Sequence, residues 1–145
     1  MTDLTLKTDT THSCFVPLVS STIAAGFPSP ADDFVDSSIN LNEFLIHHPA
    51  ATFLMRVSGL SMQDAGIIND DFVIVDRSIT AKNGHIVIAL IDNEFTLKYL
   101  HKYHDGFRLS AANKDFSDIV LTPNSTNEIW GVVTGSFRKY TIFPS

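Results

Sequence analysis

The chain has 145 residues, of which 44% are hydrophobic and 18% are charged, and its formal net charge is −6. This length and composition predict one compact globular domain with a tail. The acidic balance argues against direct binding to duplex DNA, which favours clustered lysine and arginine. The lone Cys14 excludes an internal disulfide and suits a reducing compartment. Without a long apolar stretch or a signal-type N-terminus, we expect a cytoplasmic protein that does not bind a membrane.

Residues 1–38 are expected to form an extended N-terminal arm rather than a folded element. The first residues are mostly polar, and Pro28 and Pro30 favour extended backbone at the residues before them. An extended segment around Ala25 and Gly26 suits a peptidase cleft, in which a substrate lies as a strand. A plain linker is the alternative interpretation.

The remainder, residues 39–145, is predicted to be a mainly β domain with one or two short helices. Asn40 can cap a helix over Leu41–His48, which Pro49 would end. The side chains expected to face the core are Leu41, Phe44, Leu45 and His48. Near-continuous apolar runs indicate strands buried on both faces. We expect these strands at 51–57, 72–76, 85–91, 94–103, 107–111, 119–121 and 129–140, with a helical turn over 63–68 and a turn at Asp105-Gly106.

Ser61 is the first candidate for chemistry. It follows the strand predicted over 51–57, and the Ser58-Gly59 pair breaks the alternation of that strand, so the chain turns there. A serine presented at such a turn can act as a nucleophile when a base takes its proton. An ordinary polar turn is the alternative.

Lys98 is the candidate base. It lies in the second arm of a predicted hairpin whose turn is Asp92-Asn93, so it should face Val87, with Thr96 opposite Ala89 on the same side. Apolar neighbours disfavour the charged amine, and a neutral lysine can activate a serine. A solvated lysine on a strand is the alternative.

Three motifs in order resemble the self-cleaving Ser-Lys peptidases of the LexA/UmuD family. They are Ser58–Met62, then Phe95–Lys98, and upstream the segment Ala24–Pro30, which resembles the family's cleavage segment. Several other stretches resemble UmuD-like members in particular. The resemblance implies a compact, twisted β-sheet peptidase domain like the LexA C-terminal domain. It also implies that Ser61 is the nucleophile, that Lys98 is the general base and that the bond between Ala25 and Gly26 is cut.

The resemblance implies a biological role as well. UmuD-like proteins cleave themselves when stimulated by RecA filaments on single-stranded DNA. The shortened homodimer then serves a UmuC-like Y-family polymerase in error-prone translesion synthesis during the SOS response. A non-cleaving interaction module or a LexA-like regulator acting at full length is the alternative. The few residues before Gly26 leave no room for the DNA-binding domain of LexA-like repressors, which favours the UmuD-like role.

No metal or cofactor is predicted. His101 and His104 have a spacing that suits ligands on a helix, whereas this region is predicted to be a strand and a turn. The neighbouring carboxylates at 70 and 71 would point to opposite faces of a strand. We find no zinc-spaced cysteines and no phosphate-binding loop.

Overall fold

The computed structural model describes residues 14–19, 22–26, 35–104, 106–122 and 126–141 of the chain. The chain divides into two compact units, residues 1–49 and 50–145. The predicted turn at Asp105-Gly106 lies partly outside the described residues, as do the first thirteen residues and the proline-containing segment 27–34. Within the described ranges, no helix has the length and apolar character needed to span a membrane.

The N-terminal unit contains a two-stranded antiparallel sheet. Strand β1 (Phe15–Val19) pairs with β2 (Val35–Asn40), with Phe15 opposite Asn40. The backbone N–H of Leu41, just after β2, donates to the carbonyl of Cys14 over 2.8 Å. Part of the predicted arm is therefore a β ribbon, and Ala25 and Gly26 lie exposed in the connection between its strands. The predicted division after residue 38 falls within β2, whereas the structure divides after Pro49.

Helix α1 is shorter than predicted. It covers Leu41–Leu45 instead of 41–48, and its N-terminus is capped as expected, because the Asn40 side chain accepts from the N–H groups of Asn42 at 3.1 Å and Glu43 at 3.4 Å. The chain leaves the helix at Ile46 in an extended conformation.

The expectation that α1 buries an apolar face is wrong. None of its residues is buried, and Phe44 is 62% exposed. His48, beyond the helix, is exposed as well. The physical reason is that Pro49 disfavours helical backbone at the residue before it, so the helix is short. A helix of about one turn presents too small an apolar face to be buried. A short 3-10 helix, η1 (Pro49–Ala51), follows.

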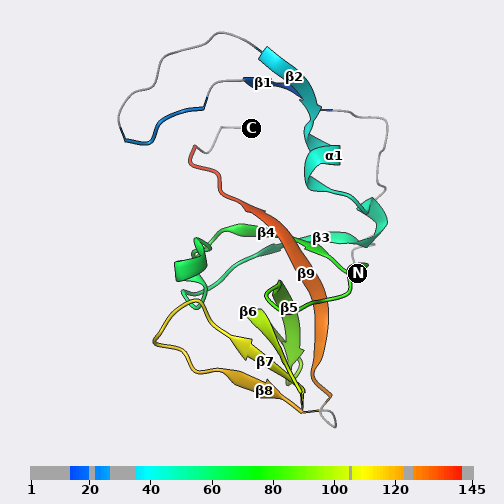
Figure 1. The fold of residues 1–145 in the computed structure, drawn as a ribbon, viewed down its shortest axis with the longest axis vertical. Helices are drawn as coiled ribbons and strands as arrows, with labels where there is room; N and C mark the ends of the chain where they lie inside the picture. The colour runs from blue at the N-terminus through cyan, green and yellow to red at the C-terminus, as the bar shows by residue number, and fades with distance from the viewer. Residues whose placement is uncertain (1–13, 20–21, 27–34, 105, 123–125, 142–145) are drawn as a thin grey trace, which may run out of the picture. The chain divides into compact units, whose positions relative to one another are not determined.

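The C-terminal unit is built on a seven-stranded antiparallel sheet in the order β3-β4-β9-β5-β6-β7-β8. In Figure 1 the long strand β9 runs across this sheet between β4 and β5. The mainly β prediction is thus confirmed, and every expected strand is found: β4, β6 and β8 have the predicted bounds, and the others have ends shifted by one to three residues. The strands are β3 (Thr52–Arg56), β4 (Phe72–Asp76), β5 (Ile86–Ile91), β6 (Glu94–Tyr103), β7 (Gly106–Ser110), β8 (Ile119–Leu121) and β9 (Glu128–Phe137).

The β5–β6 hairpin has the predicted register. Asp92 and Asn93 form its turn with positive φ values of 50° and 65°, which suit the twist of a tight hairpin. Val87 therefore lies opposite Lys98, and Ala89 lies opposite Thr96.

Two apolar cores form around the sheet. Val87 and Ala89 of β5 belong to one core and Ile88 to the other, because successive residues on a strand point to opposite faces. The prediction of strands buried on both faces is confirmed for the centre of β5. Gly131 on β9 lies so close to β4 that a Cβ at this position would be 2.5 Å from Cγ1 of Val75.

Candidate active site

Ser61 lies on a turn that is tied to the sheet. Beyond β3, the N–H of Val57 donates to the carbonyl of Asp71 over 2.7 Å, and the N–H of Gly59 donates to Oδ1 of Asn69 over 2.8 Å. Gly59 has a φ of 102°, in the region that favours glycine, and no atom lies within 4 Å of where its Cβ would be. Glycine is therefore favoured here by its backbone conformation.

Met62 anchors the same turn from the other side of Ser61. Its side chain is fully buried in the same core as Ile88, and its carbonyl accepts from the N–H of Ala65 at 3.0 Å. The helical turn that follows, η2 (Gln63–Ala65), is shorter than predicted because Gly66 adopts a left-handed conformation and ends it. Ser61, which is half-buried, is thus held between two fixed points of the chain.

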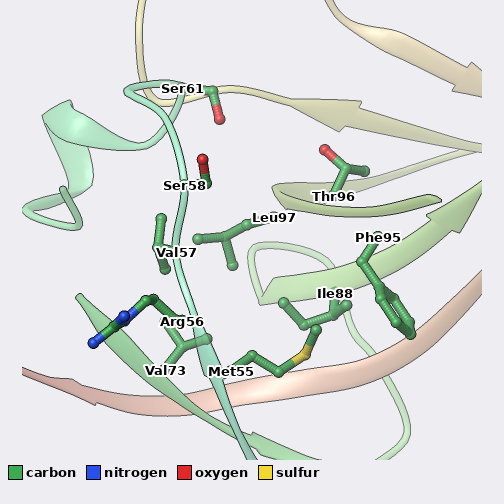
Figure 2. Close-up of a pocket in the computed structure, with 10 residues that line it drawn as sticks. All are labelled: Met55, Arg56, Val57, Ser58, Ser61, Val73, Ile88, Phe95, Thr96 and Leu97. Atoms are coloured by element: carbon green, nitrogen blue, oxygen red, sulfur yellow. The ribbon is translucent and has the colours of Figure 1, made fainter. Parts of the chain in front are cut away.

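A cavity of about 200 Å³ opens beside this turn. Figure 2 shows the hydroxyls of Ser58 and Ser61 pointing into this space, with Thr96 across from them on β6. The rest of its lining is mostly apolar and comes from β3, β4, β5 and β6: Met55, Arg56, Val57, Val73, Ile88, Phe95 and Leu97. The cavity therefore combines hydroxyl groups with a surface against which an apolar peptide could pack.

Lys98 is buried in the interior of β6. Only 6% of its surface is exposed, and its cross-strand neighbour Val87 is fully buried. Its amine lies 5.7 Å from the ring centroid of Phe116. Within the described part of the chain, this amine has no ion pair. Burial therefore lowers the pKa of Lys98 below its ordinary value.

Of the four predicted site residues, only Ser61 lines the cavity. Lys98 does not, although its neighbours Thr96 and Leu97 do. Among the residues that the structure describes, no hydrogen bond joins Ser61 to Lys98. Ala25 and Gly26 belong to the N-terminal unit, where both are exposed.

Two further residues contact the serine turn or Lys98, and the sequence analysis did not predict them. The Nδ2 group of Asn113 donates to the carbonyl of Leu60 over 2.9 Å, and Phe116 faces the Lys98 amine. Phe116 is 48% exposed. An aromatic residue within the polar run Asn113–Asp118 was the available signal, but it does not say which side chain the ring contacts.

The chain belongs to the Peptidase S24-like family, whose model it matches over residues 17–134. It is 44% identical to Protein MucA of Salmonella typhimurium over 128 residues, which cover 88% of this chain and 87% of MucA. Protein ImpA of Shigella flexneri is 50% identical over 84 residues, 58% of each chain. The LexA repressor of Clostridium novyi (strain NT) is 38% identical over 125 residues, which cover 86% of this chain and 60% of the repressor. The resemblance to the LexA/UmuD family is thereby confirmed, with UmuD-like proteins among the relatives.

Proposed function

We propose that this protein is a UmuD-type serine peptidase of the SOS response that cuts its own chain between Ala25 and Gly26. The observation that carries the proposal is a buried lysine for which the described residues provide no counter-ion, next in sequence to residues that line a cavity containing Ser61. Such a lysine can be neutral near physiological pH and can therefore accept a proton. Membership in a peptidase family supports this interpretation.

In the proposed reaction, Oγ of Ser61 attacks the carbonyl carbon of Ala25 while the neutral Lys98 amine takes the hydroxyl proton. The tetrahedral intermediate collapses, the C–N bond to Gly26 breaks, and Lys98 delivers the proton to the departing amine. Water then attacks the acyl-enzyme with Lys98 again as base, and this step releases the free carboxylate of Ala25 and regenerates Ser61.

The developing oxyanion needs N–H donors from the serine turn. The N–H of Gly59 is already bonded to the Asn69 side chain, so it does not serve this purpose in the observed conformation. The backbone N–H of Ser61 itself is the donor that we propose.

Because the substrate is part of the same chain as the enzyme, a small cavity with weak affinity could be enough to bind it. A tethered segment has a high effective concentration at the site, so little intrinsic affinity is needed. Control of the reaction then depends on whether the segment around Ala25 and Gly26 enters the cavity. We propose that RecA filaments on single-stranded DNA promote this step. We also propose that the product, beginning at Gly26, acts as a cytoplasmic homodimer with a UmuC-like Y-family polymerase in translesion synthesis.

The test is the intact mass of the protein after incubation with RecA, single-stranded DNA and an ATP analogue. We expect a product that begins at Gly26. Ser61→Ala should abolish its formation and leave the fold intact, because only one hydroxyl at a turn is lost. The control Ser136→Ala, at an exposed position of β9, should cleave normally.

Two outcomes would contradict the proposal. Cleavage in Ser61→Ala that is lost in Ser58→Ala would assign the nucleophile to the other serine of the cavity. An unchanged mass under every condition would favour an interaction module that acts at full length.

A further inference from the structure

The loop over residues 111–118, between β7 and β8, contacts both candidate catalytic regions. At one end, the carbonyl of Ala112 accepts from the N–H of Asp64 over 2.8 Å. Asn113, which is only 8% exposed, donates to the carbonyl of Leu60, the residue directly before Ser61. The loop is therefore bonded to the serine turn on both sides of Ser61.

Asn113 also shapes the loop itself. Its side-chain Oδ1 accepts from the N–H of Asp115 at 3.1 Å, and its backbone carbonyl accepts from the N–H of Phe116 at 3.2 Å. These bonds fold the loop into a tight turn. The turn brings the ring of Phe116 to the amine of Lys98.

We propose that residues 111–118 form a positioning loop for self-cleavage, in which Asn113 holds the serine turn in place and Phe116 covers the Lys98 amine. This inference rests on the proposed function, since it gives the loop a role in that reaction. Neither residue is placed in contact with the substrate. They act through Ser61 and Lys98.

The Phe116 ring has two opposing effects on the charge of Lys98. Its apolar body excludes water and favours the neutral amine, whereas its π face favours the cation. The separation of 5.7 Å is near the outer limit of about 6 Å for a cation–π contact, so the second effect is weak. Exclusion of water is therefore the dominant effect.

No charged neighbour competes with this effect among the described residues. The neighbours of Lys98 on its own side of the hairpin, Val87, Thr96 and Leu100, carry no charge. The charged residues of the loop, Lys114, Asp115 and Asp118, are exposed, and no ion pair joins any of them to Lys98.

The first experiment measures the rate of unstimulated self-cleavage as a function of pH. Phe116→Ala opens the amine to water, so the midpoint of the profile should rise by about one pH unit and cleavage at pH 7 should slow about tenfold. The rate at high pH should remain near that of the wild type. Phe116→Leu retains an apolar cover without the π face, and its midpoint should stay within about 0.3 units of the wild type. A midpoint that Phe116→Ala leaves unchanged or lowers would overturn the role of Phe116.

Asn113 should affect a different part of the same profile. Asn113→Ser keeps an oxygen that can accept from Asp115 but is too short to reach Leu60. We expect the plateau rate at high pH to fall about tenfold with an unchanged midpoint, because the serine turn is loosened while the lysine stays covered. A plateau equal to that of the wild type, in a variant that melts as the wild type does, would overturn the role of Asn113.

A direct titration separates this inference from the proposed function. The ¹³Cε signal of Lys98 can be followed by NMR against pH in the Ser61→Ala protein, with and without Phe116→Ala. A higher titration midpoint in the double variant supports the cover even if the wild-type chain fails to cleave, a failure that would contradict only the proposed function. Equal midpoints in the two proteins would overturn the cover whether or not the chain cleaves.

Discussion

At the residue scale, the protonation of Lys98 determines whether Ser61 can be activated. An exposed lysine has a pKa of about 10.4, so roughly one in 2,500 is neutral at pH 7. Burial lowers the pKa of Lys98 and raises this fraction. The unstimulated cleavage rate should therefore rise about tenfold per pH unit below the lysine pKa and become constant above it.

Substitution of Lys98 tests the same assignment. Lys98→Arg should stay uncut over the whole pH range, because a guanidinium remains charged and cannot accept the proton. Lys102→Arg, an exposed position on the same strand, should cleave at the wild-type rate. A pH-independent rate between about 7 and 10, or normal cleavage by Lys98→Arg, would exclude Lys98 as the base.

The same residues show which contacts a sequence can predict. Lys98 opposite Val87 could be predicted because the turn residues Asp92 and Asn93 tolerate positive φ, and a tight turn determines the pairing of the strands that it joins. The contact of Lys98 with Phe116 could not, because it depends on how a separate loop folds back against β6. Local backbone chemistry determines the first contact, while tertiary packing determines the second.

At the element scale, the close approach of β9 to β4 depends on Gly131. Gly131→Ala would place a Cβ only 2.5 Å from Cγ1 of Val75, in the middle of the sheet. Overpacking of this kind costs about 1–3 kcal/mol, and we expect a loss of that size in the free energy of unfolding, measured with urea. Gly135→Ala on the same strand is the matched control, because its Cβ would meet Cδ1 of Ile74 at an ordinary 3.5 Å. Equal losses in the two variants would show that the effect is general to β9 and not due to this contact.

Elements differed in how well their sequence determined them. Apolar runs such as Phe72–Asp76 gave correct strands because a buried strand needs little more than apolar side chains and a turn at each end. The predicted end of α1 is too far along the chain, because Pro49 limits how far the helix can extend but does not determine where it ends. The β1–β2 ribbon was not expected, since its strands are interrupted by proline or rich in serine and are stabilised mainly by pairing with each other.

At the scale of the whole molecule, an ion pair makes stability depend on pH. Asp71, before β4, accepts from Nε of Arg138, after β9, at 2.6 Å and from its second guanidinium nitrogen at 2.7 Å. The hydrogen bond to Arg138 is the main reason that the pKa of Asp71 lies below its ordinary value. A carboxyl with a lowered pKa in the folded state stabilises the fold above its unfolded pKa of about 4, and this contribution is lost as pH falls through the folded value.

Asp71→Asn should therefore lower the Tm at pH 7 by about 5 °C or more, and the difference from the wild type should shrink below about pH 4. Asp70→Asn should leave the Tm unchanged, because Asp70 is exposed and its positive φ of 72° suits asparagine. Melting curves of the three proteins at pH 7 and about pH 3 make the comparison. A difference that is the same at both pH values would assign the effect of Asp71 to packing instead of charge.

The position of Ala25 and Gly26 between β1 and β2 gives the proposed cut a topological consequence. One covalent chain now joins the two strands, and hydrolysis would leave them on separate molecules. Their pairing would become bimolecular and lose the effective concentration that the connection provides, and an isolated two-stranded ribbon is marginal even when its strands are joined. After dilution the β1 peptide should depart and take with it the Cys14 carbonyl that accepts from Leu41. Once the β1 peptide has left, the remaining chain cannot rebuild the ribbon by itself. The edge of β2 that paired with β1 is then open to a strand from another chain.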